Sequence, residues 1–334
     1  MRNPIKDTDY LAISARIKAM ETTLLTRERM EQVLEAKTDD EALKLLQESG
    51  YPQLRGTDPT SLDAALSAAR EESFADLTDS APDPRYIDVF RLKYDYHNIK
   101  VLLKAAAVGA DPDPMLADMG RVGVQQLRDA LTSGETAELP PMLAAAAAEA
   151  KEVLDTTRDP QLSDIVLDRW SYRDMLDVAE STGSAFLLGY VQVQIDAANL
   201  RALVRTLRMG KNEAFLSGVL FEGGDIPADA ILKVSADKGA GLKELYEPTR
   251  FREAAECAQE SLHGGALTEF ERLCDDAVND YLSGAQFVPF GEAPLVGYLA
   301  ARETEYTNLR ILLTGRGTGL SPDVIRSRLR SCQA

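Results

Sequence analysis

One short phrase recurs three times along the chain, and its spacing limits the fold more than any other feature. In each copy an acidic residue is followed three positions later by asparagine, then by an aliphatic, a basic, a variable and two more aliphatic residues. Asn98, Asn199 and Asn308 lie 101 and 109 residues apart, too far for a solenoid repeat of about 20–50 residues. The spacing predicts three similar helical domains with pseudo-threefold symmetry. The copies read DYHNIKVLL at 95–103, DAANLRALV at 196–204 and EYTNLRILL at 305–313.

The residue types of this phrase predict where each side chain points on a helix. The aliphatic residues one, four and five places after the asparagine form a contiguous stripe that faces a core. The bases two and six places after it, Lys100 with Lys104 and Arg201 with Arg205, are predicted to face solvent. We expect the asparagine to hydrogen-bond backbone groups where two helices cross. A polar ligand site repeated three times is the alternative interpretation.

A second phrase follows the first and defines the units. It consists of two aliphatic residues five positions apart, which open a short helix after a glycine-bearing turn. With the polar stretches between the copies, it predicts helical units at 1–134, 135–238 and 239–334. The copies are Gly120-Arg-Val122 with Leu127, Gly224-Asp-Ile226 with Ile231 and, more loosely, Gly319-Leu320 with Ile325.

The charge balance excludes several classes of partner. The chain carries 37 basic and 54 acidic residues, a formal net charge of −17. An acidic surface repels phosphate backbones and anionic headgroups, so binding to nucleic acid or to a membrane surface is not expected. The uncharged stretches are too short to span a bilayer and residues 1–9 hold no apolar segment, which predicts a cytoplasmic protein without direct membrane insertion.

Composition and local signals both indicate an all-α fold. Aromatic residues make up only 6% of the chain, which favours helices over strands. Thr38 and Glu41 form a capping box before a helix over 42–47, and the Asp58-Pro59 turn precedes a helix over 61–77. A long helix over 86–107 should carry the first repeat phrase.

Few residues are candidates for chemistry. Asp275, Asp276 and Asp280 resemble the acidic cluster with which all-α isoprenoid synthases hold magnesium and diphosphate. No second acidic motif faces them, however, and a solvated acidic face is the preferred interpretation. His97 falls inside the first repeat phrase, where the other copies have alanine and threonine, so a catalytic dyad with His263 is not expected.

The remaining special residues predict no site either. Trp170 is expected in a core, and Cys257, Cys274 and Cys332 are interpreted as reduced thiols because they form no CxxC pair. A phosphate loop, a dinucleotide-binding glycine motif and a zinc-binding HExxH motif are all absent. The sequence therefore predicts no catalytic, cofactor-binding or metal-binding residues, and no binding of ATP by this chain itself.

The order of these motifs resembles that of the C subunits of the bacterial and archaeal V/A-type rotary ATPases, the counterparts of the eukaryotic d subunit. The likeness covers nearly the whole chain. It rests on residues 10–20 with Leu24-Leu25, Leu45-Leu46 with Gly50-Tyr51, residues 95–104, residues 303–313, Gly315-Arg-Gly and residues 325–329.

The resemblance implies three helical domains around a pseudo-threefold axis that form a funnel. It also implies a non-catalytic socket on the cytoplasmic face of the membrane, without a cofactor. The socket would receive the central shaft, made of the D-type and F-type subunits, and pass torque to the membrane rotor ring of proteolipid subunits. Two other hypotheses are an all-α enzyme that uses Asp275, Asp276 and Asp280 with magnesium, and a free-standing helical adaptor.

Overall fold

The computed structural model describes residues 6–56, 58–262 and 264–332 and is all-α within them. About 73% of these described residues are helical, and they contain no strand. None of the described helices is long and apolar enough to cross a membrane. The helices are η1 (Asp7–Tyr10), α1 (Leu11–Glu21), α2 (Arg27–Glu35), α3 (Asp39–Glu48), α4 (Pro59–Ser80), α5 (Arg85–Val108), η2 (Asp113–Met115), α6 (Val124–Ser133), α7 (Pro141–Thr157), α8 (Pro160–Thr182), α9 (Ala185–Arg208), α10 (Glu213–Val219), α11 (Ala228–Ala236), α12 (Leu242–Tyr246), α13 (Arg252–Ser261), α14 (Thr268–Ser283), η3 (Gly284–Phe287), α15 (Glu292–Gly317) and α16 (Pro322–Arg326).

Side-chain caps fix several helix starts close to the predicted places. The Thr38 hydroxyl accepts from the backbone N–H of Glu41, and the Glu41 carboxylate reaches back to the N–H of Lys37. Asp58 accepts from the N–H of Ser61 at the start of α4. Both helices begin two or three residues earlier than predicted, because the first helical residue directly follows the capping residue. The predicted long helix over 86–107 is confirmed as α5.

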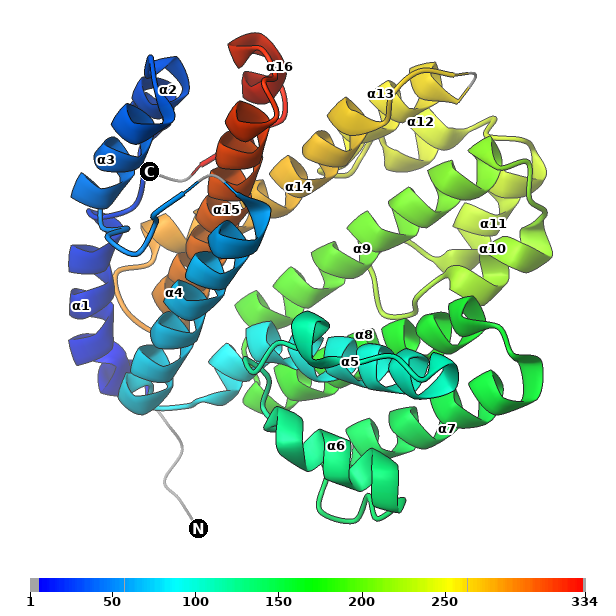
Figure 1. Ribbon diagram of the computed structural model, residues 1–334. Helices are drawn as coiled ribbons and strands as arrows, with labels where there is room; N and C mark the ends of the chain where they lie inside the picture. Colours follow the sequence, from blue (N-terminus) through cyan, green and yellow to red (C-terminus); the bar gives the residue numbers. More distant parts are fainter. Residues whose placement is uncertain (1–5, 57, 263, 333–334) are drawn as a thin grey trace.

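The three repeat helices, α5, α9 and α15, start near one another and diverge (Figure 1). At this convergent end the Ser184 hydroxyl donates to the Glu292 carboxylate over 2.8 Å. The rings of Phe90 and Tyr190 stack with centroids 5.4 Å apart, which joins α5 to α9. Most other helices lie along the diverging parts, while α1 packs at the convergent end, where the rings of Tyr10 and Tyr86 meet edge to face. The molecule therefore has one common vertex and three spread arms.

The buried cores do not follow chain order. The largest cluster joins the first half of α5 to α9, α14 and α15, and a second joins the remainder of α5 to α6, α7 and α8. The third contains Leu25, Met30, Leu46 and Leu66 together with Leu309 and Leu312 from α15. The N-terminal helices α2 and α3 therefore complete the arm that α15 begins. The unit boundaries at 134 and 238 stay a prediction.

Candidate functional site

Each repeat asparagine makes the same pair of hydrogen bonds. Its side-chain oxygen accepts from a backbone N–H, and its side-chain nitrogen donates to the carbonyl of that same residue, 19 to 22 positions further on. All three asparagines are buried. The partners are Ala117 for Asn98 (2.8 and 2.9 Å), Phe221 for Asn199 (2.8 and 2.8 Å) and Arg330 for Asn308 (3.1 and 2.8 Å).

Backbone hydrogen bonding by the asparagines is thus confirmed, with one correction. The asparagine holds a loop residue just after the next short helix along the chain, which is η2, α10 or α16, rather than a crossing helix. The reason is the availability of hydrogen-bonding groups. An amide side chain can pair with both the free N–H and the free carbonyl of one loop residue, whereas residues inside a helix have already paired theirs.

The acid three positions earlier holds the next part of the same loop. Asp95 accepts from the N–H of Val122 at 3.1 Å and from Arg121 at 2.8 Å. Asp196 accepts from the N–H groups of Asp225 and Ile226, at 3.2 and 3.1 Å. The carboxylates lie so close to the turn that its glycines, Gly120 and Gly224, leave no room for a Cβ atom.

The third copy of the second phrase comes from the other end of the chain. Burial raises the pKa of Glu305, although this carboxylate accepts from the Tyr51 hydroxyl and from the backbone N–H of Leu25, which both oppose the shift. Leu25 precedes the N-cap of α2 just as Val122 and Ile226 precede the N-caps of α6 and α11. Leu25 and Met30 are also five positions apart, and both are buried.

The predicted short helix after Gly319 is confirmed as α16, with Ile325 buried, but its equivalence to the other two copies of the second phrase is wrong. Gly319 follows α15 in a left-handed conformation and comes before Arg330, the residue held by Asn308. In the other two copies the glycine comes after the residue that the asparagine holds. Leu25, near the N-terminus, takes the place of Val122, because its backbone N–H donates to the acid of the repeat phrase. In this sense the repeat is circularly permuted.

The repeated bases join one repeat helix to the next unit through ion pairs. Lys104 and Arg205 face solvent as predicted, with side chains 44% and 58% exposed, whereas Lys100 and Arg201 are half-buried, which corrects the prediction for these two. Their partners lie on α8, α14 and α4, each of which precedes the next repeat helix, α9, α15 and α5. The last pair returns from α15 to α4 and closes the cycle. The pairs are Lys100–Asp168 (2.5 Å), Lys104–Asp164 (2.5 Å), Arg201–Glu271 (2.7 Å), Arg205–Glu271 (2.7 Å) and Arg310–Asp63 (2.7 Å).

Sequence reasoning missed these acidic partners. A signal was present, because Asp164 with Asp168 and Glu271 with Asp275 are carboxylate pairs four positions apart on the helices before the second and third repeat. Such pairs are common in an acidic chain. Whether they form ion pairs with the repeated bases depends on which helix lies opposite them in the fold.

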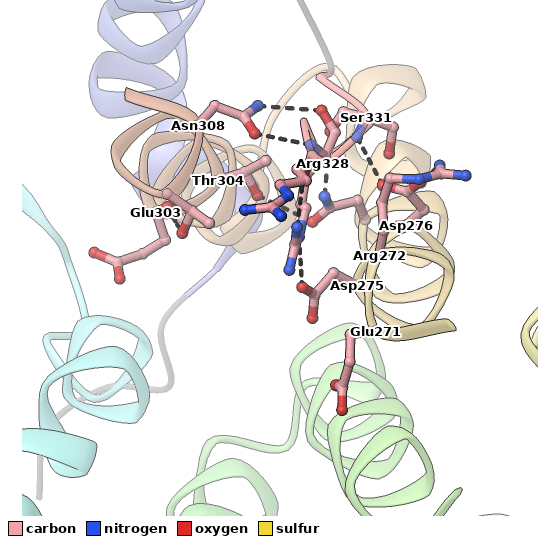
Figure 2. A network of polar contacts seen from close by, with 12 residues as sticks. Glu271, Arg272, Asp275, Asp276, Glu303, Thr304, Asn308, Arg328 and Ser331 are labelled. Atoms are coloured by element: carbon pink, nitrogen blue, oxygen red, sulfur yellow. Dashed lines mark hydrogen bonds and ion pairs between the residues drawn. The ribbon is translucent and has the colours of Figure 1, made fainter. Parts of the chain in front are cut away.

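The three aspartates considered for magnesium do not converge. Asp275 pairs with Arg201 and Arg330, while Asp276 pairs with Arg272 and accepts from the N–H of Ser331. Figure 2 shows this network tying the C-terminal residues to α14 and to Asn308. Asp280 lies elsewhere, exposed beside Arg250.

The magnesium-enzyme hypothesis fails on this geometry. Each carboxylate already has a cationic partner, so a metal ion would compete with existing ion pairs. Within the described part of the chain, no group of three His, Cys, Asp or Glu residues could hold a metal ion.

The other single residues have structural neighbours. The His97 ring contacts the Met115 carbonyl at 2.9 Å, and His263 lies outside the described residues. Trp170 is half-buried and donates to Glu149 at 2.7 Å. The cysteines are free thiols, and burial raises the pKa of Cys274 to about 12.

We expect Asn308→Ala to lower the free energy of unfolding by about 1–3 kcal/mol, because it leaves the N–H and carbonyl of Arg330 without their partner. Urea unfolding measures the loss, and amide exchange at Arg330 should accelerate. Thr307→Ala is the matched control, since that exposed hydroxyl bonds only its own helix at Glu303. Equal losses in both variants would contradict a specific role for the asparagine.

Asp196 should make stability depend on pH. Burial, with the Asp225 charge, raises the pKa of Asp196 to about 6 despite two backbone N–H donors. Among the described residues no cation pairs with it, in contrast to the arginine beside Asp95. The folded state then binds the proton more tightly than the unfolded state. This contribution to stability is complete below about pH 3.8 and is lost as pH rises through 6.

The measurement is the free energy of unfolding of wild type and Asp196→Asn from pH 4 to 7. The difference between them should change with pH across this window. Asp229→Asn, at an exposed position on α11, should keep the wild-type slope. A difference for Asp196→Asn that is constant with pH would refute the assignment.

The fold and its asparagine-held loops define a helical protein with three related arms, and comparison with known proteins gives the family. The family model for the ATP synthase (C/AC39) subunit matches residues 13–328, so the chain belongs to that family. It is 27% identical over 325 residues to the C subunit of the V-type sodium ATPase of Enterococcus hirae, covering 96% of this chain and 98% of that protein.

Archaeal relatives show the same extent of match. The C subunit of the A-type ATP synthase of Methanocaldococcus jannaschii is 26% identical over 348 residues, covering 96% of this chain and 86% of that protein. The corresponding protein of Haloquadratum walsbyi is 25% identical over 335 residues, covering 94% of this chain and 96% of that protein. The resemblance found in the sequence motifs is thereby confirmed.

Proposed function

We propose that this chain is the non-catalytic central-stalk subunit of a V/A-type rotary ATPase, a socket that couples the central shaft to the membrane rotor ring. The observation that carries the proposal is the closed cycle of contacts between the three repeat helices and the unit that follows each. A cyclic arrangement resists twisting in the same way at every arm, whereas an open chain of domains would yield at its ends.

Packing supplies most of the stiffness of this cycle. The partly exposed ion pairs at the seams are each worth only about 0–1 kcal/mol. The buried cores shared between elements contribute more. Glu303, whose side chain is 18% exposed, also accepts from Arg70 at 2.6 Å and from Lys93 at 2.6 Å, and thereby ties α15 to both α4 and α5. Burial alone would raise the pKa of Glu303, but pairing with these two cations lowers it, so the carboxylate stays ionised.

Exposed apolar side chains suggest where the partners bind. Val108 and Met209, at the divergent ends of α5 and α9, are 78% and 56% exposed. Phe287, in the segment before α15 at the convergent end, is 86% exposed. We assign the divergent end to the shaft, with its D-type and F-type subunits, and the convergent end to the proteolipid ring at the cytoplasmic face of the membrane.

The test is affinity purification of the tagged chain from detergent-solubilised membranes, followed by identification of the bound subunits. We expect shaft and ring subunits together. Val108→Asp with Met209→Asp should reduce recovery of the shaft but keep the ring, and Phe287→Asp should do the reverse. These exposed positions leave the fold intact, so each variant is the control for the other. Recovery of neither partner with wild type would favour the free-standing adaptor.

A further inference from the structure

A cavity lined by four arginines lies at the seam where the first and last parts of the chain meet. Its volume is approximately 350 Å³. The lining comes from α4, α15, the first turn of α14 and the C-terminal tail that Asn308 holds. The lining arginines are Arg70, Arg310, Arg328 and Arg330, accompanied by Thr268, Tyr306 and Thr307.

Most of these arginines keep N–H donors to spare. Arg70 reaches Glu303 through Nε, and Arg330 uses Nε for Asp275 and one terminal nitrogen for a carbonyl. Arg310 pairs with Asp63 through one terminal nitrogen. A guanidinium carries five donors, so each pairing leaves some of them unused. Their carboxylate partners do not line the cavity, which leaves its wall cationic.

Arg328 differs from the other three arginines because its guanidinium has no carboxylate partner at all within the described residues. It is half-buried and belongs to the tail that lies between α15 and α14 (Figure 2). In a chain of net charge −17, a half-buried guanidinium with no ion pair, beside three further arginines, marks an electrostatic potential suited to an anion.

We propose that this cavity binds a small phosphate-class oxyanion. Its donors come from three separate elements and therefore approach from several directions. A tetrahedral oxyanion accepts from several directions at once, whereas a planar carboxylate matches a single guanidinium fork. The bound anion joins α4 to α15 and to the C-terminal tail, so it strengthens the seam that closes the cycle.

The experiment is calorimetric titration of the isolated full chain with inorganic phosphate and with pyrophosphate, at constant ionic strength. We expect saturable binding that Arg328→Gln weakens at least about tenfold. Arg252→Gln removes the same charge from an exposed site on α13 and should bind as wild type does. Equal weakening in both variants, or no saturation with wild type, would overturn the proposal.

Thermal unfolding gives a second readout. Phosphate stabilises proteins generally by exclusion from their surfaces, and that part of the rise in Tm should persist in Arg328→Gln. The additional rise from specific binding should be present in wild type and Arg252→Gln alone. If a triglutamate peptide binds the cavity and phosphate does not, the cavity receives acidic side chains of a partner and the proposal is wrong.

Discussion

Membranes from a strain that lacks this chain should lose ATP-driven ion uptake while the shaft-and-head assembly keeps hydrolysing ATP. The chain is proposed to transmit torque and to perform no chemistry, so its removal leaves the catalytic cycle intact and disconnects the ring. Ion uptake should fall to the background of vesicles without ATP.

The measurement compares ATP hydrolysis with ion uptake in vesicles from the deletion strain. Re-expression of the wild-type chain is the control and should restore uptake. The Val108→Asp and Met209→Asp double variant should restore it poorly, because its shaft contact is weakened while its fold is kept. Normal uptake without the chain would rule out the coupling role.

Gly120→Ala should lower the free energy of unfolding by about 2–4 kcal/mol, because the added methyl group has no room. We expect no larger loss of stability from any other single substitution considered. The new Cβ would overlap Oδ1 of Asp95 and lie 3.3 Å from the backbone nitrogen of that residue. The Asp95 carboxylate cannot turn aside without losing Val122 and Arg121, both of which it holds.

Gly123→Ala is the matched control, three residues further along the same turn. A Cβ there meets no atom within 4 Å, and φ is −61°, so the change should stay within about 0.5 kcal/mol. Urea unfolding of both variants measures the difference. If the two variants lose the same stability, the close approach of Asp95 does not constrain this turn.

The repeat helices were predictable because their signals are local. The aliphatic stripe at 99, 102 and 103 repeats with the period of a helix, and Asp58-Pro59 begins α4 whatever packs against it. The hydrogen-bonding role of Asn98 was also within reach, since a buried amide must find backbone partners. Local geometry likewise disfavours a metal site at 275–280, because an i, i+1, i+5 spacing spreads carboxylates around a helix.

The helices, their triplication and the family could all be inferred from the order of residues. The folded chain was needed to show that Leu25 and Met30, at the start of the chain, complete the unit that Glu305 and Asn308 begin near its end. Helical periodicity is a relation between neighbours in the chain. The closure of a cycle is a relation between its two ends, and it is fixed by which buried surfaces fit and which carboxylates meet which bases.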